Sequence, residues 1–253
     1  MEQKTTNNNA EFLIILIGII SIGSIILYGL SQRTTHESPK INHSNYVFGI
    51  DVSHYQEKIN WDKVKTSHHP IQYAFIRASM GTNGVDSKFE RNWKDAEHAG
   101  YIKGAYHYYR PNEDAAQQFE NFKQRVKLKS GDLPPVLDIE ATSRHGNDHL
   151  INELKKWLAL AETHYGVKPI IYTGKTFYEH YIKNNITGYP LWIAAYSGKN
   201  RLTGIDWTFH QFSERVRVTG IRHRVDGNDF NGTYDDLRRM CVGWGEGDGC
   251  CET

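Results

Sequence analysis

Cysteine is scarce in this chain and is absent from most of it. The three cysteines, Cys241, Cys250 and Cys251, lie in the last thirteen residues, so the body of the protein cannot depend on disulfide bonds. A Cys241–Cys250 bridge is compatible with an exported tail, but the odd number leaves one thiol without a partner. The tail offers no CxxC pair and no nearby histidine, so no zinc site is expected there.

An excess of charge of one sign is also lacking. The 253 residues contain 30 Lys and Arg against 29 Asp and Glu, which gives a formal net charge of +1. A near-neutral chain has no basic excess of the kind that binds nucleic acid, so no nucleic-acid partner is expected. Internal repeats are absent, and the length suits one large domain or two small ones.

Only one long hydrophobic run is present, from Phe12 to Leu30. It contains no charged residue and is long enough to span a bilayer as a helix. A cleaved signal peptide has a shorter apolar core and a small-x-small cleavage site, which this segment lacks. The sequence therefore predicts a membrane anchor that holds the remaining domain outside the cytoplasm, with secretion after cleavage as the alternative. Lys4 and Arg33 lie on opposite sides of the run, so the positive-inside rule does not fix its orientation.

These features predict a polar tail (1–11), an anchor or signal segment (12–30), a linker (31–45), a folded domain (46–240) and a Gly/Cys-containing tail (241–253). Within the folded domain, strand and helix patterns alternate. Strands followed by helical patterns are expected at Val47–Asp51, Tyr73–Ala78, Ile102–Tyr109, Pro135–Glu140 and Pro169–Tyr172. Helices are expected at Trp61–Ser67, Ser87–Ala99, Asp114–Leu128, Leu150–Tyr165 and Lys175–Lys183.

Three more strands, Leu191–Tyr196, Trp207–Phe212 and Arg222–Asp226, follow with little helix between them. Alternating strands and helices imply a parallel sheet. Eight strands in this length indicate a closed α/β barrel whose last helices are missing or reduced, with its active site at the C-terminal ends of the strands.

The triplet Asp138-Ile139-Glu140 is the most informative motif in the domain. Alternate residues of a strand point to the same face, so both carboxylates are expected to project side by side. Two such groups cannot both ionise freely, so one pKa should rise. A proton donor beside a fixed anion at neutral pH is what cleavage of a glycosidic bond requires.

Further polar and aromatic residues occur at the other predicted strand ends. Asp51 ends the first strand and Asp226 the last, and these strands become neighbours only if the barrel closes. Each residue also has an ordinary structural interpretation: Asp226 precedes Gly227-Asn228, a turn signature, and Asp229 is a rival for its position. His107 and His210 are interpreted as buried structural histidines rather than catalytic groups. Six more candidates for the site are Tyr106, Tyr108, Tyr172, Trp192, Tyr196 and Gln211.

Several segments together resemble glycoside hydrolase family 25. They are FGIDVSHYQ at 48–56, Trp61, YAFIRA at 73–78, GAYHY at 104–108, DIE at 138–140, IYT at 171–173, LWIA at 191–194 and HQF at 210–212. The resemblance covers about 46–240 and implies a (β/α)5(β)3 barrel. It also implies hydrolysis of the β-1,4 bond between N-acetylmuramic acid and N-acetylglucosamine in peptidoglycan, without a metal or other cofactor.

By matching position, the resemblance implies that Glu140 is the general acid and that Asp138 acts on the 2-acetamido group or through a water. Asp51 and Asp226 complete the acidic site. The aromatic candidates would contact sugar rings. Inversion and substrate-assisted retention both stay open, because spacing in the sequence does not give the separation of the carboxyl groups. The alternatives are an inactive glycan-binding protein and a glycosidase for another amino sugar polymer such as chitin. A monomer is expected.

Overall fold

The structure, a computed structural model, describes residues 46–68, 70–197 and 202–244. The expected anchor at 12–30, the tail and linker on either side of it, and Cys250 and Cys251 lie outside these residues. Within the described part of the chain, no helix is long and apolar enough to cross a membrane.

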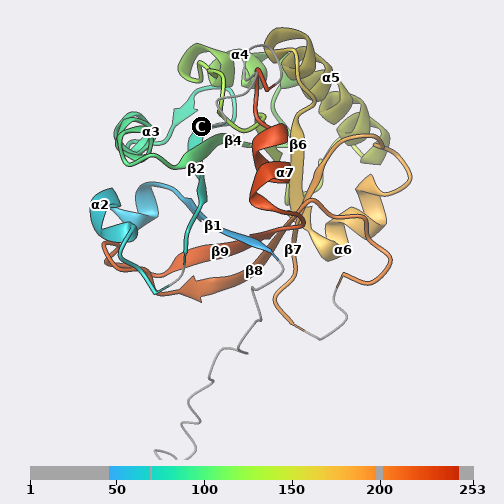
Figure 1. Ribbon diagram of the computed structural model, residues 1–253. Coiled ribbons are helices and arrows are strands. Elements are labelled where there is room, and N and C mark those ends of the chain that lie inside the picture. The colour runs from blue at the N-terminus through green and yellow to red at the C-terminus, as the bar shows by residue number, and fades with distance from the viewer. Residues whose placement is uncertain (1–45, 69, 198–201, 245–253) are drawn as a thin grey trace, which may run out of the picture. The chain divides into compact units, whose positions relative to one another are not determined.

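Eight strands form a closed barrel, as the sequence predicts (Figure 1). Parallel pairing runs from β1 through β2, β4, β5, β6 and β7 to β8. The barrel closes because β9 pairs with both β8 and β1. Strand β9 is antiparallel to both β8 and β1. The strands are β1 (Val47–Val52), β2 (Tyr73–Met80), β4 (Ile102–Tyr108), β5 (Val136–Asp138), β6 (Ile170–Gly174), β7 (Leu191–Ala194), β8 (Phe209–Val216) and β9 (Val225–Phe230).

Helices follow the first five strands of the barrel, which confirms the predicted alternation. They are α2 (Trp61–Val64), α3 (Phe89–His98), α4 (Ala115–Arg125), α5 (Asn147–Tyr165) and α6 (Lys175–Phe177), the last continuing into the π-helical turn η3 (Tyr178–Ile182). In the described residues, no helix separates β7 from β8 or β8 from β9. The result is the predicted eight-stranded barrel, without helices between its last three strands in the part of the chain that the structure describes.

Large aromatic side chains fill the barrel, and glycines in the wall make room for them. Phe75 stacks on Trp192 with ring centroids 4.4 Å apart, and both are almost fully buried. A Cβ on Gly104 would lie 2.5 Å from the Phe75 ring, and a Cβ on Gly49 would lie 2.3 Å from the Tyr73 ring. The interior is therefore a packed core below the C-terminal rim of the strands rather than a pore.

The structure differs from the sequence prediction in the strand positions of two acidic residues, Glu140 and Asp226. Strand β5 ends at Asp138. The Ile139 N–H still donates to the Tyr172 carbonyl, and beyond it the chain leaves the sheet and continues to α5. Glu140 is therefore not a strand residue. The sequence predicted Asp226 at the end of the last strand, but the residue lies near the start of β9. Since β9 runs antiparallel, its beginning reaches the rim at which the parallel strands end.

Three smaller elements were not predicted. Strand β3 (Gly84–Val85) forms a hairpin with β2, and the turn η2 (His54–Gln56) follows β1. Helix α7 (Tyr234–Arg239) buries Leu237 in the same apolar cluster as the barrel interior. Just after α7, the buried Cys241 has no disulfide partner among the described residues, and its Sγ contacts the Leu237 carbonyl at 3.5 Å.

Candidate active site

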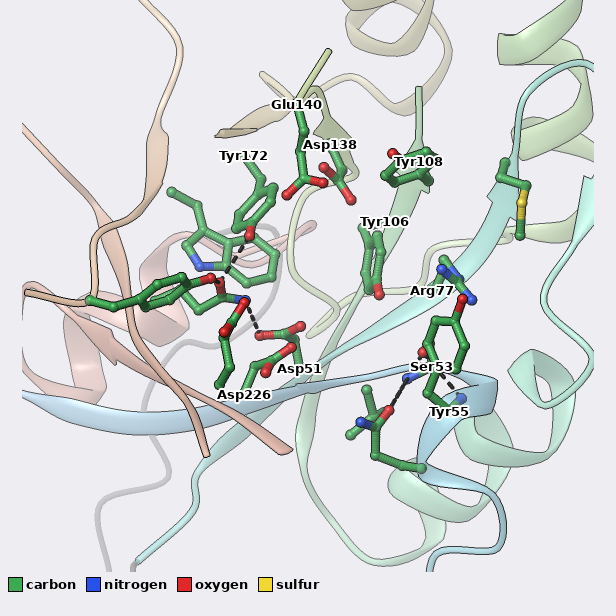
Figure 2. A pocket seen from close by; sticks show the side chains of 17 residues that line it. Asp51, Ser53, Tyr55, Arg77, Tyr106, Tyr108, Asp138, Glu140, Tyr172 and Asp226 are labelled. Carbon is green, nitrogen blue, oxygen red and sulfur yellow. Dashed lines mark hydrogen bonds between the residues drawn. The ribbon is translucent and has the colours of Figure 1, made fainter. Parts of the chain in front are cut away.

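A cavity of about 440 Å³ opens at the C-terminal rim of the barrel. It brings together all ten residues that the sequence predicted for the site. The four carboxylates are Asp51, Asp138, Glu140 and Asp226, and the other six are Tyr106, Tyr108, Tyr172, Trp192, Tyr196 and Gln211. Figure 2 shows Asp138 and Glu140 side by side, with Asp51 and Asp226 forming a second pair across the cavity.

Asp138 and Glu140 differ in how far they are withdrawn from water. Asp138 is 6% exposed, and its Oδ1 has no hydrogen-bond partner among the described residues. Burial raises the pKa of Asp138 well above its usual value, and the charges of Glu140 and Asp51 raise it further. Glu140 is an exposed residue whose carboxyl reaches into the cavity, where burial of the carboxyl raises its pKa while a hydrogen bond with Tyr172 opposes the rise.

The pKa of Asp138 changes the expected division of roles between the two acids. The sequence predicted a fixed anion at Asp138, yet burial favours the protonated form of this carboxyl. Burial also favours a proton on Glu140, so Asp51 is a better candidate for the anion of the site than either of them.

The second pair, Asp51 and Asp226, lies directly opposite in the β1–β9 register. Burial and the neighbouring Asp51 charge raise the pKa of Asp226 to about 9. Burial also raises the pKa of Asp51, but hydrogen bonds from Asn228 and Gln211 oppose that rise. One proton is therefore shared between two carboxyls, and the donors favour the charge on Asp51.

Two polar relays end on the Oδ2 atom of Asp51. Gln211 Nε2 donates to it at 2.9 Å, while the hydroxyls of Tyr172 and Tyr196 donate to Gln211 Oε1 at 2.9 and 2.5 Å. Asn228 Nδ2 also donates to Asp51 Oδ2, at 2.7 Å. Gln211, predicted as a substrate-binding residue, is 3% exposed and uses its amide to hold Asp51.

Arg77 is the cation that lines the cavity, and the sequence-based choice of site residues did not include it. Its Nε donates to Asp86 at 3.0 Å, and the backbone N–H groups of His54 and Lys88 also donate to the buried Asp86 carboxylate. Its guanidinium carbon lies 5.2 Å from the Tyr55 ring centroid. Asp86 was missed because a single acid in a loop carries no signal that it holds an arginine.

Tyr55 and Tyr196 are the exposed aromatic residues of the cavity, at 68% and 44% exposure. Trp192, in contrast, is 2% exposed and forms part of the floor. Sugar rings stack on open aromatic faces, so the two tyrosines offer better stacking surfaces than the predicted tryptophan.

The residues interpreted as structural lie outside the cavity. His107 is buried between Ser79 Oγ, 2.8 Å from its Nδ1, and Gln118 Oε1, 3.2 Å from its Nε2. His210 places its Nε2 2.9 Å from the Ala195 carbonyl. Asp229 is buried but does not line the cavity, so Asp226 occupies the position for which the two competed.

A second hollow, of about 530 Å³, meets the first at Glu140 and Tyr196. Lys175, Thr176 and Phe177 at the start of α6 form one wall of it. Within the described residues, no group of three or more His, Cys, Asp or Glu side chains is placed to hold a metal ion. The four carboxyl groups thus lie where two hollows adjoin, with Glu140 lining both.

Comparison with known proteins points to one family. The family model described as "Glycosyl hydrolases family 25" matches residues 50–221. Lysozyme M1 of Streptomyces globisporus is 32% identical over 85% of this chain and 78% of its own length. An uncharacterized protein of Escherichia coli, YegX, is 38% identical over 81% of this chain and 76% of its own.

Solved structures give the same result. A bacterial lysozyme from Streptomyces coelicolor superimposes with a TM-score of 0.71 at 31% identity, over 78% of this chain and 97% of that one. A family 25 glycosyl hydrolase from Bacillus anthracis gives a TM-score of 0.75 at 28% identity, over 82% and 99% of the two chains.

Proposed function

The chain belongs to glycosyl hydrolases family 25, and from this premise we propose how it works as a lysozyme on peptidoglycan. The bond cleaved is the β-1,4 linkage between N-acetylmuramic acid and N-acetylglucosamine. The observation that carries the proposal is the grouping of four carboxyls in one cavity, with Asp138 and Glu140 opposite Asp51 and Asp226.

Glu140 is the proton donor to the glycosidic oxygen. It is the carboxyl that lines both hollows, so a sugar chain crossing from one hollow to the other passes beside it. Its raised pKa favours the protonated form that a general acid needs. The deeper, carboxyl-rich cavity takes the sugar on one side of the bond, and the groove beside α6 takes the sugar on the other.

Asp51 supplies the negative charge that stabilises the cationic sugar as the bond breaks. Two amide N–H groups bind its Oδ2, which favours its ionised form. A fixed anion near an oxocarbenium-like centre lowers the barrier because the positive charge develops only in the transition state.

Asp138 orients the 2-acetamido group of the sugar. Its buried Oδ1 has no partner among the described residues, and a buried polar atom without a partner is costly. A protonated carboxyl offers one donor and one acceptor, which match the C=O and N–H of an acetamido group. This pairing leaves the proton of Glu140 available for the glycosidic oxygen.

The uncharged segment 12–30 anchors the protein in a membrane, and the barrel acts as a monomer outside the cytoplasm. The support is the length and apolar character of that segment, together with a substrate that lies in the cell wall. Protease protection of the full chain in membrane vesicles tests the anchor: a membrane-protected fragment that includes residues 12–30 is expected, and full release by alkaline carbonate would refute it.

Replacement of Glu140 by Gln tests the assignment of the acid. Loss of general acid catalysis should lower the rate of peptidoglycan hydrolysis about 10²- to 10⁴-fold while the fold is retained. Glu90→Gln is the matched control, because Glu90 is an exposed carboxylate on α3 outside both hollows. Circular dichroism checks the fold. An undiminished rate for Glu140→Gln would show that Glu140 is not the acid.

Mass spectrometry of the products tests the bond. Muramic acid at the new reducing ends is expected, and glucosamine there would contradict cleavage of the proposed linkage. Binding to purified sacculi without any product would favour the glycan-binding alternative. Release of products from chitin but not from sacculi would favour a glycosidase for another amino sugar polymer.

A further inference from the structure

Asn228 is a buried residue of β9 that sequence reasoning did not select. It is fully buried, and it shares the interior face of β9 with Asp226 because the two lie two positions apart. It lies 177 positions along the chain from Asp51, to whose Oδ2 its Nδ2 donates at 2.7 Å. A buried amide beside a carboxyl pair can set which carboxyl is charged.

The orientation of the Asn228 amide is fixed by its other neighbour. The indole Nε1 of Trp192 donates to Asn228 Oδ1 at 2.8 Å, and an indole N–H can only donate. The oxygen of the amide must therefore face Trp192, and its NH₂ group must face Asp51. Trp192 is itself held by stacking on Phe75, so the donor has little freedom to move.

The second donor is Gln211, whose Oε1 accepts from the hydroxyls of Tyr172 and Tyr196 while its Nε2 donates to Asp51. Because a hydroxyl can donate or accept, only the Asn228 amide is held in its orientation by a group that can only donate. Asp51 Oδ2 thus receives two N–H groups and has no need of a proton. The carboxyl of Asp226 hydrogen-bonds the Asp51 side chain, and one proton must lie between the two acids.

No cation contacts the Asp51–Asp226 pair among the described residues. The acidic groups that face Asp51 are Asp226 on β9, Glu214 on β8, and Asp138 and Glu140 at β5. The remaining titratable groups are the buried tyrosines Tyr73, Tyr106 and Tyr172, the half-open Tyr196, and Arg77, which is bound to Asp86. Neutral amides therefore stabilise the negative charge of the pair, in place of a lysine or arginine.

We propose that Asn228 is a positioning residue which, held by Trp192, confines the negative charge of the carboxyl pair to Asp51 and leaves the proton on Asp226. The inference rests on the proposed function, in which Asp51 is the anion that faces the reacting sugar. A charge fixed on Asp51 lies in the cavity at a constant position, whereas a charge shared with Asp226 would be spread over the side chains of both strands, β1 and β9.

Two variants test the inference. Asn228→Leu removes both hydrogen bonds at similar volume, and Trp192→Phe removes the donor that orients the amide together with part of the buried ring that stacks on Phe75. Loss of a hydrogen bond to a charged group should lower kcat/KM about 10- to 100-fold in Asn228→Leu, with a smaller loss in Trp192→Phe. In both, the acid limb of the kcat/KM profile should move to higher pH, because Asp51 ionises less readily without its donor. Asn185→Leu, at an exposed asparagine after η3, should behave as the parent.

A second measurement separates this inference from the proposed function. Carbon-13 NMR of the aspartate carboxyls, with Asp51→Asn and Asp226→Asn for assignment, should show Asp51 ionised and Asp226 protonated at neutral pH in the parent. In Asn228→Leu, or in Trp192→Phe if the leucine variant does not fold, Asp51 should titrate at higher pH. An unchanged titration of Asp51 would overturn the positioning role even if peptidoglycan is cleaved. A parent that titrates as expected but releases no muramic acid ends would instead refute the proposed function alone.

Discussion

Acid should destabilise this barrel through His107, a buried side chain on the outer face of β4. Gln118 Nε2 donates to the carbonyls of Arg110 and Glu113, so Gln118 Oε1 must accept from His107 Nε2. The Nδ1 atom then accepts from the Ser79 hydroxyl. The neutral ring is satisfied at both nitrogens, whereas a second proton would bury a positive charge and require the Ser79 hydroxyl to turn and accept instead of donating.

The magnitude follows from the pKa of this ring. Burial lowers the pKa of His107 from 6.5 to about 4. Between these values the unfolded chain binds a proton that the native state refuses, so stability falls as the pH falls through this window. At full extent the difference is about 3 kcal/mol, and between pH 7 and pH 4.5 it is about 2–3 kcal/mol.

Urea unfolding, followed by tryptophan fluorescence at pH 7 and pH 4.5, measures this loss. The comparison is with His107→Gln, whose amide can donate to Gln118 and accept from Ser79 but does not titrate. The buried carboxyls of the cavity contribute equally to both proteins and cancel in the difference. His98→Gln, at an exposed histidine of α3, should retain the parent behaviour. Equal pH dependence in the parent and in His107→Gln would refute the reasoning.

Two further perturbations act on the barrel wall and on the carboxyl pair. Gly104→Ala should cost about 1–3 kcal/mol in thermal unfolding, because the new Cβ would lie 2.5 Å from the Phe75 ring. Gly174→Ala, where no atom lies within 4 Å of the new Cβ, should be close to neutral. Ionisation of the general acid Glu140 lowers kcat/KM as the pH rises, and a separate fall is expected at about pH 9, where Asp226 loses its proton beside Asp51. Asp226→Asn should remove only the fall at about pH 9, and persistence of that fall would contradict the assignment.

The barrel and its acidic rim could be predicted because they depend on local patterns. Each βα unit carries its own periodicity, and the DIE triplet ends an apolar run that can only be a buried strand. Closure of the barrel then predicts that Asp51 lies beside Asp226, and this prediction requires no information on side-chain contacts. These inferences needed the order of the elements and not their exact boundaries.

The last strand was misread because its sequence resembles a turn. Asp226-Gly227-Asn228 has turn composition, yet Gly227 serves a different need: a Cβ there would lie 2.6 Å from Val216 and 2.8 Å from Phe212. The glycine permits close packing of β9 against side chains of β8, and the period of two places Asp226 and Asn228 on the interior face. The alternation was present in the sequence, but the turn signature concealed it.

The partners of the charged groups could not be predicted, because they are set by contacts between distant segments. Asn228 meets Asp51 only through the closed barrel, and Asp86 reaches Arg77 only because the β2–β3 hairpin folds back on its own strand. A sequence pattern gives the number of carboxyls at a rim. It does not give the donors that decide which of them is charged.

That distinction explains how the same residue type performs different tasks in this cavity. Asp138 and Asp51 are both 6% exposed, so burial alone would protonate both. Asp138 has an oxygen without a partner, whereas Asp51 receives two amide N–H groups, so only Asp51 can be held as an anion at little cost. The division of labour among the acids therefore lies in the neutral residues behind them, and a relative that kept every carboxyl but lost the amide of Asn228 should bind the same glycan and cleave it more slowly.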